Sequence, residues 1–170
     1  LVAPYYGHDS SFTDQYKREA QSIAAATGGE YLLIQSTSAT GPAIAENFVD
    51  KGVVFFDSHG TQSGTSSYLC LTTNSGITQE DYNNGWAVRS GSAAFIDGRY
   101  IENHTPDTLS NCLVWMAICE GMKRQGQGTT GYALLRAGAG VVYGYSQSVT
   151  FAGEYVYEVT FWNAMKNADD

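Results

Sequence analysis

The sequence has few positive charges and no long apolar run, and each absence excludes a class of partner. Only nine of the 170 residues are Lys or Arg, against 17 Asp or Glu, which gives a formal net charge of −8. A surface that follows nucleic-acid phosphates needs clustered Lys and Arg, so we expect no nucleic-acid partner. No apolar run approaches the ~18 residues of a membrane-spanning helix, and we expect no membrane partner either.

Cysteine is also scarce, and its spacing carries no metal or disulfide signature. Three cysteines cannot form an even disulfide framework, and we expect Cys70 and Cys112 to be free thiols rather than a bridge. No pair of Cys or His has zinc-finger spacing, and no acidic cluster resembles a calcium loop. We therefore expect neither a metal site nor a cofactor.

What remains is an ordinary globular composition, with 43% hydrophobic and 15% charged residues. We interpret residues 1–170 as a single domain, large enough to bury a sizeable core. The chain begins at Leu1 without a methionine or a charged-then-apolar leader, so we expect a processed or excised fragment with further domains outside it. The low charge and the many Gly, Ser, Thr, Asn and Tyr residues favour a secreted or cell-surface location.

Two short apolar runs are the main structural signal. Leu113–Ile118 is too short for a buried helix and predicts a strand buried on both faces, and it ends at Cys119. Val53–Phe56 has the same character and is followed by Asp57, Ser58 and His59. The carboxyl ends of parallel strands meet at one edge of a sheet, where ligands bind, so we expect a thiol and an imidazole to share that edge.

The rest of the chain alternates helices and strands with short connections, which predicts an α/β fold with a mainly parallel sheet. Helices are expected around residues 14–27, 41–51, 130–137 and 153–166, the last of them amphipathic, and short strands at residues 31–34 and 141–145. Residues 61–111 are rich in turn formers and are interpreted as an insertion near the site. Asp97-Gly98 predicts a two-residue hairpin between residues 93–96 and 99–101, with one short helix around residues 78–82.

Cys119 and His59 are the residues with the clearest chemistry. A thiol is mostly protonated at neutral pH, and a neighbouring imidazole can convert it to the nucleophilic thiolate. Gly60 has no side chain, so its amide can approach a substrate oxygen and form an oxyanion hole with the amide of Cys119. The alternatives are a cysteine that serves as a small core hydrophobe and a histidine that bonds a nearby carbonyl.

The order of these motifs resembles the caspase-like (clan CD) cysteine peptidases, which include caspases, legumains, clostripain, gingipains and CHAT domains. The shared features are an apolar strand ending in His59-Gly60, about sixty further residues and an apolar strand ending in Cys119. The run Ala137–Gly144 and an aromatic closing helix with Phe161-Trp162 are most similar to the gingipain and clostripain side.

The resemblance implies a caspase-like three-layer α/β/α fold and a thiol protease that hydrolyses peptide bonds in a peptide or protein substrate. Cys119 would be the nucleophile, His59 the general acid for the leaving amine, and water would hydrolyse the acyl-enzyme. Relatives that cut after basic residues often carry an acid two positions before the cysteine. Ala117 stands there, so the resemblance does not extend to that specificity.

Four residues are candidates for substrate binding. Glu120 and Asp57 are the nearest acidic side chains, and each fits a solvated strand-end charge equally well. Ser146 and Ser148 follow the strand that lines the primary pocket in the fold that the chain resembles. Two other functions stay open: a catalytically silent or CHAT-like binding or signalling module of the same fold, and an amidase that acts on small molecules.

Overall fold

The two apolar runs form adjacent central strands of a parallel sheet. The computed structural model describes residues 1–12, 14–109, 111–123 and 126–167. Its main sheet has the order β2-β1-β3-β8-β9, and all of its strand pairs are parallel. The strands are β1 (Val2–Ala3), β2 (Ile34–Gln35), β3 (Val53–Asp57), β8 (Leu113–Ala117) and β9 (Val141–Gly144).

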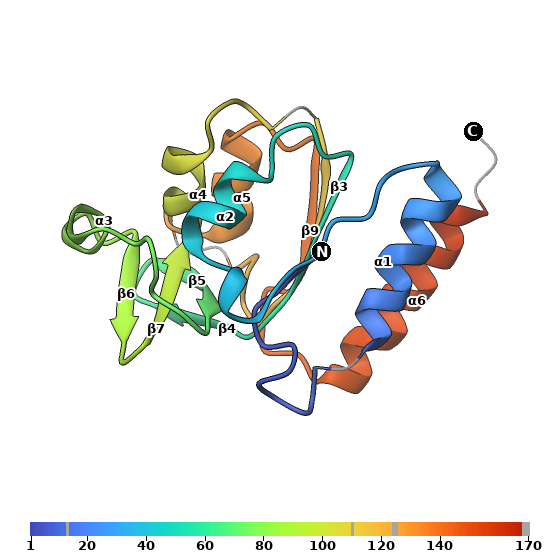
Figure 1. Cartoon of the computed structure of the whole chain (residues 1–170), viewed down its shortest axis with the longest axis horizontal. Coiled ribbons are helices and arrows are strands. Elements are labelled where there is room, and N and C mark those ends of the chain that lie inside the picture. The colour runs from blue at the N-terminus through green and yellow to red at the C-terminus, as the bar shows by residue number, and fades with distance from the viewer. Residues whose placement is uncertain (13, 110, 124–125, 168–170) are drawn as a thin grey trace.

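Helices cover both faces of this sheet, which makes a three-layer α/β/α fold (Figure 1). One face carries α1 (Asp14–Thr27) and α6 (Phe151–Lys166), which lie side by side. The other face carries α2 (Gly41–Glu46), α4 (Gly98–His104) and α5 (Thr130–Arg136), and a short 3-10 helix (Ser36–Ser38) precedes α2. The predicted α/β class with a mainly parallel sheet is therefore correct.

The central strands bury their side chains on both faces, as continuous apolar runs in parallel sheets do. Phe55, Trp115 and Ala117 pack toward α1 and α6, together with Trp162. Side chains one residue out of phase, such as Met116, join the larger core beneath the other helices. Because β3 and β8 pair in register from Val53↔Leu113 to Asp57↔Ala117, they also end at the same level.

A second, antiparallel sheet follows β3 directly. Its order is β4-β5-β7-β6, and it contains β4 (Gly60–Ser63), β5 (Ser66–Leu71), β6 (Ala87–Ser90) and β7 (Ala93–Asp97). The predicted short helix is α3 (Gln79–Asn83), which begins with a capping box at Thr78 and Asp81. The predicted insertion thus contributes a sheet of its own. Its last helix, α4, packs back against α2 and α5.

The hairpin predicted at Asp97-Gly98 is wrong. Asp97 ends β7 and starts α4, because its carboxylate accepts hydrogen bonds from the Arg99 and Tyr100 amides and pairs with the Arg99 side chain. The residues predicted as the second hairpin strand are therefore helical. The actual turn of this hairpin lies between β6 and β7, where Gly91 has φ +61°.

The final helix exposes apolar residues and buries acidic ones, against the amphipathic pattern predicted for it. The residues of α6 that face the protein are Glu154, Glu158 and Trp162, spaced four apart. Val156 and Tyr157 point outward and are 64% and 69% exposed. Which face of this helix is buried is thus set by packing against α1 and the sheet, and not by apolar content.

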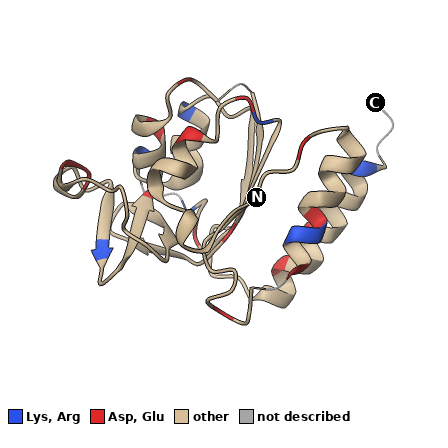
Figure 2. Cartoon of the chain, in the orientation of Figure 1, with Lys and Arg blue, Asp and Glu red and all other residues tan. Residues whose placement is uncertain are grey.

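The predicted helix and strand boundaries differ from the observed ones by a few residues, most at the second helix, which ends at Glu46 well before Gly52. All three cysteines are free, as expected for Cys70 and Cys112. Within the described residues, none of the helices combines the length and apolarity needed to cross a membrane. Lys and Arg are scattered over several elements (Figure 2).

Candidate active site

Cys119 and His59 lie side by side at the carboxyl edge of the parallel sheet. Each comes two residues after the last paired position of its strand, Asp57↔Ala117, and the Ser58 amide still donates to the Ala117 carbonyl at 3.3 Å. Side chains alternate along a strand, so both residues continue the row that faces α1 and α6. The structure therefore brings the two predicted site residues to one place.

Neither residue is sealed in the interior. The His59 side chain is 42% exposed, and Cys119 is half-buried. In Figure 1 the dark-blue loop after β1 and the orange start of α6 meet at this lower end of the sheet. Both segments supply neighbours of the two residues, so the site lies between the sheet edge, the loop after β1 and the start of α6.

Gly60 is the residue that permits the close approach of the two strand ends. A Cβ on Gly60 would lie 2.1 Å from the Cys119 carbonyl oxygen and 2.8 Å from its amide nitrogen. Any larger residue would force the backbones apart. The expected role of the Gly60 and Cys119 amides as oxyanion donors requires this proximity.

A carboxylate that the sequence analysis missed stands behind the imidazole. Asp9 Oδ2 lies 3.2 Å from His59 Nε2, and its other oxygen accepts the Ser11 amide at 2.8 Å. The Ser11 amide and hydroxyl, and then His59, hold the pKa of Asp9 below its usual range. Asp9 is therefore a fixed anion that can orient the ring and stabilise its protonated form, leaving Nδ1 for chemistry.

Three aromatic rings form a frame around the imidazole. The ring centroids of Tyr5 and Phe12 lie 4.6 and 4.9 Å from that of His59, both in edge-on arrangements, and Phe151 lies 6.3 Å away. Phe12 and Phe151 also contact each other at 5.1 Å. These contacts fix the ring plane and limit the rotamers of His59, which pre-organises it for proton transfer.

The segment after β9 forms a wall beside Cys119. The Val149 amide lies 3.4 Å from the Cys119 sulfur, and the sulfur lies 3.7 Å from the Val149 carbonyl oxygen. The Glu120 and Met122 amides donate to Gln147 and Tyr145 of the same segment. Ser146 and Ser148, two of the predicted substrate-binding residues, are exposed on this wall.

Glu120, a third predicted substrate contact, is held by the protein itself. It adopts φ +61°, a left-handed conformation that is unusual for residues other than glycine, directly after the cysteine. Its carboxylate pairs with Lys123 Nζ at 3.4 Å. A substrate cation would have to compete with Lys123, so Glu120 is a weaker candidate than its position in the sequence suggests.

Asp57, the fourth candidate, is neither a pocket wall nor a solvated charge. It is 2% exposed and lies beneath the site, with Glu154 and Glu158 of α6 as neighbours. Burial and then the charge of Glu154 raise the pKa of Asp57 well above its usual range. Burial also raises the pKa of Glu154 to about 7 and that of Glu158 to about 9. The prediction of a substrate contact is therefore wrong for Asp57, which belongs to a buried carboxyl cluster.

The other two cysteines are poor nucleophiles. Cys70 lies on β5 next to the site, where its amide donates to the His59 carbonyl at 3.0 Å, but it is only 5% exposed. Burial, and after it the nearby Cys119, raises the pKa of the Cys70 thiol to about 12. Burial also raises the pKa of Cys112, which is 1% exposed.

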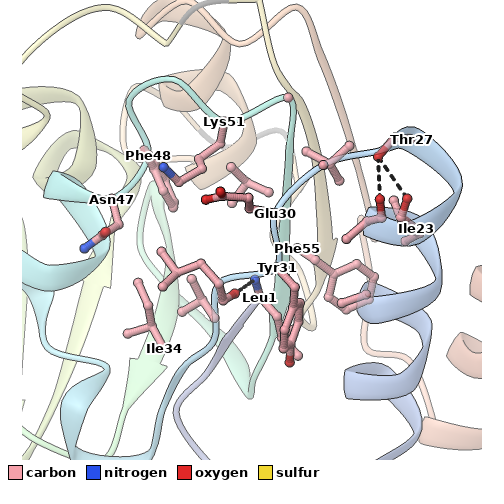
Figure 3. Close-up of a pocket in the computed structure, with 18 of the residues that line it drawn as sticks. Leu1, Ile23, Thr27, Glu30, Tyr31, Ile34, Asn47, Phe48, Lys51 and Phe55 are labelled. Carbon is pink, nitrogen blue, oxygen red and sulfur yellow. Dashed lines mark hydrogen bonds between the residues drawn. The ribbon is translucent and has the colours of Figure 1, made fainter.

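A cavity of about 740 Å³ lies at the amino-terminal end of the parallel strands, opposite to the end that carries Cys119 and His59. Figure 3 shows apolar side chains such as Ile23, Phe48 and Phe55 around it, and the Leu1 amine bonded to Leu32. None of the predicted site residues lines it. Across the described residues, no group of three or more His, Cys, Asp or Glu side chains could hold a metal ion.

The sequence contains a signal that the loop carrying Asp9 lies near the site, but no signal that Asp9 itself contacts His59. The short apolar start of the chain, Leu1–Ala3, is compatible with a strand, and Val2 does pair with Phe56 of β3. The loop after β1 must then lie at the same edge as His59, which brings Tyr5–Phe12 to the site.

The chain matches no protein-family model, and no curated protein or solved structure is detectably similar to it.

Proposed function

We propose that this protein is a cysteine endopeptidase in which Cys119 and His59 form the catalytic dyad. The observation that carries the proposal is the juxtaposition at one sheet edge of a half-buried thiol, an exposed imidazole and an anion behind that imidazole. Acyl transfer through a thiol requires a nucleophile, a base beside it and a group that orients the base, and Cys119, His59 and Asp9 are arranged to take these roles. The motif order that resembles clan CD peptidases supports the same reaction.

In the proposed mechanism, the Cys119 sulfur attacks the carbonyl carbon of the scissile peptide, and the sulfur–carbon bond forms as the carbonyl π bond opens. The amides of Gly60 and Cys119 donate to the oxyanion. The proton of the thiol passes to His59 and from its Nδ1 to the leaving amine, which departs as the carbon–nitrogen bond breaks. Water then hydrolyses the thioester, and the thiol regains its proton.

Asp9 acts in this mechanism through His59. Its carboxylate accepts a hydrogen bond from Nε2–H, which fixes the tautomer with Nδ1 toward the substrate. It also stabilises the imidazolium that must give its proton to the amine. The reaction needs no bound group beyond these side chains and water.

The test is cleavage of a mixed peptide library by the full chain, with products identified by mass spectrometry. We expect cleavage within peptide sequences, and we expect Cys119→Ala to lower it by at least ~10³-fold, because the nucleophile is lost. Cys112→Ala removes a buried thiol far from the site and is the matched control. Equal activity of Cys119→Ala and wild type would refute the mechanism.

The rival functions predict different results in the same assay. A silent or CHAT-like binding module of this fold would leave every peptide intact. A small-molecule amidase would cut simple amides without regard to the peptide around them. The exposed imidazole with its own carboxylate favours the peptidase over the silent module, since a binding module has no need of an oriented imidazole.

A further inference from the structure

A second, smaller hollow is lined by two contacts of His59, Tyr5 and Asp9, and by no residue of the wall beside Cys119. Its volume is about 540 Å³, and it lies between the loop after β1 and the end of the antiparallel sheet. The residues that line it are Tyr5, His8, Asp9, Ser10, Thr72 and Ala93. Two of these lining residues, Tyr5 and Asp9, also contact the His59 ring, so the hollow adjoins the immediate neighbours of the imidazole.

The proposed mechanism puts the two halves of a peptide substrate on different flanks of the dyad. The general acid must stand within hydrogen-bond reach of the leaving nitrogen, so the residue that follows the scissile bond begins beside His59. In the proposed mechanism the acyl half is bonded to the Cys119 sulfur, and Val149, at the end of the segment that pairs with Glu120 and Met122, is the neighbour of that sulfur. The hollow shares Tyr5 and Asp9 with the surroundings of His59, so it is the candidate site for the side chain on the departing amine.

The lining of this hollow is polar and anionic. Asp9 is its one carboxylate, with a side chain 35% exposed, and no Lys or Arg is among the lining residues. The loop that carries Asp9 is anchored, since His8 Nε2 lies 2.7 Å from Ser36 Oγ and Thr72 Oγ1 donates to the Pro4 carbonyl. Ala93 contributes only a methyl group, which leaves room for a long side chain.

We infer that this hollow is a leaving-group-side subsite for the residue after the scissile bond, and that it accepts Lys or Arg and rejects Asp or Glu. The inference rests on the proposed function, because the orientation of the substrate follows from the roles of Cys119 and His59. A long cationic side chain can reach the open oxygen surface of Asp9 and hydrogen-bond to Ser10 and Thr72 around it. An acidic side chain would meet the same carboxylate and be repelled.

The experiment is a series of internally quenched peptides that share one acyl half, taken from the best library cleavage site, and differ only in the residue after the bond. We expect kcat/KM to be at least ~5-fold higher with Lys or Arg than with Glu, the size of effect that a partly exposed ion pair gives. Ala93→Leu fills the hollow and is expected to remove most of this preference. Ala164→Leu, a substitution on the exposed side of α6, is the matched control and keeps the preference.

The possible failures of the two proposals are distinguishable. If no peptide is cut and Cys119 is not alkylated, the peptidase proposal fails and the subsite fails with it. If peptides are cut through Cys119 but Lys and Glu after the bond give equal kcat/KM, only the subsite is overturned. A preference that survives unchanged in Ala93→Leu would also overturn the subsite, because the selectivity would then arise elsewhere.

Discussion

Asp9 is the residue whose role is most specific to this arrangement of side chains. It touches His59, so in the proposed mechanism it is a positioning residue that does not contact the reacting atoms. Replacing it with Asn keeps the shape but removes the charge. We expect kcat/KM to fall about 10- to 100-fold, less than the ~10²–10⁴-fold that general acid catalysis contributes, because His59 itself remains. The fall should be in kcat more than in KM.

The split between kcat and KM, and rescue by a second acid, separate this role from a structural one. A merely structural loss would reduce the fraction of folded enzyme, whereas a loss of positioning lowers kcat in enzyme that is folded. Asp9→Glu, which restores the charge, should recover part of the lost rate. A folded Asp9→Asn variant with wild-type kcat would remove Asp9 from the mechanism.

Gly60 tests the closeness of the two strand ends. In Gly60→Ala the new methyl group would overlap the Cys119 carbonyl oxygen, so the backbones must separate. We expect a loss of ~1–3 kcal/mol in the free energy of unfolding and a larger proportional loss of activity, because the oxyanion donors move. Gly52→Ala is the control, since Gly52 directly precedes β3, at the other end of that strand, and has open space around its Cβ position. Equal effects of both substitutions would contradict the packing.

At the scale of elements, the first turn of α4 is held by Asp97. This carboxylate is fully buried, and it caps the helix. It also forms an ion pair with the Arg99 guanidinium, which donates a further hydrogen bond to the Gly85 carbonyl. Asp97→Ala leaves the guanidinium without its partner and the helix without its cap, so we expect a loss of ~3–5 kcal/mol in unfolding free energy. Chemical denaturation measures it, with the exposed Asp107→Ala as control. A change below 1 kcal/mol in Asp97→Ala would contradict this account.

The interface between α6 and the sheet makes stability depend on pH. Glu154 and Glu158 of α6 face Asp57 at the end of β3. Tyr16 of α1 donates a hydrogen bond to Glu154, and Tyr145 also lies near both glutamates. Glu19 of α1 is nearby too, and it is paired with Lys166. The folded state binds protons that the unfolded state releases near pH 4.5, so the free energy of unfolding should fall as pH rises from about 5 to 9.

Glu158→Gln tests this interface. The amide cannot ionise, so the variant should be more stable than wild type at pH 9 by at least ~1 kcal/mol, and the difference should shrink toward pH 5. Urea denaturation at several pH values gives these free energies. Glu80→Gln, at an exposed position on α3, should leave the pH dependence unchanged. A wild-type stability that rises between pH 5 and 9 would show that the carboxyl cluster is not buried as described.

At the scale of the whole molecule, the sequence predicts those features that depend on local patterns. The apolar runs of β3 and β8 are short and continuous, and only a sheet covered on both faces buries such runs completely. Their common edge, and hence the meeting of His59 and Cys119, follows from parallel pairing alone. The hairpin predicted at Asp97-Gly98 is wrong because an Asp-Gly pair suits both a hairpin turn and a helix start. Only the contact between Asp97 and Arg99 decides between the two.

The remaining parts of the site depend on contacts between distant segments. Asp9 lies 50 residues before His59, and no spacing rule connects a loop residue to an imidazole in another strand. The burial of Glu154 and Glu158, with Val156 exposed instead, reverses the usual pattern of an amphipathic helix, and only the packing of α6 against Asp57 and α1 determines it. Tertiary contacts therefore place Asp9 beside His59 and bury the carboxyl groups beneath the site.

The most direct test of the proposed dyad is the rate at which a peptide acyloxymethyl ketone labels the full chain, followed by mapping of the adduct. This probe needs both a reactive thiolate and an occupied substrate site. We expect one adduct, on Cys119 and not on Cys70 or Cys112, and a labelling rate at least ~10-fold lower in His59→Ala. Labelling spread over the three cysteines, or a Cys119 rate that does not depend on His59, would contradict the account.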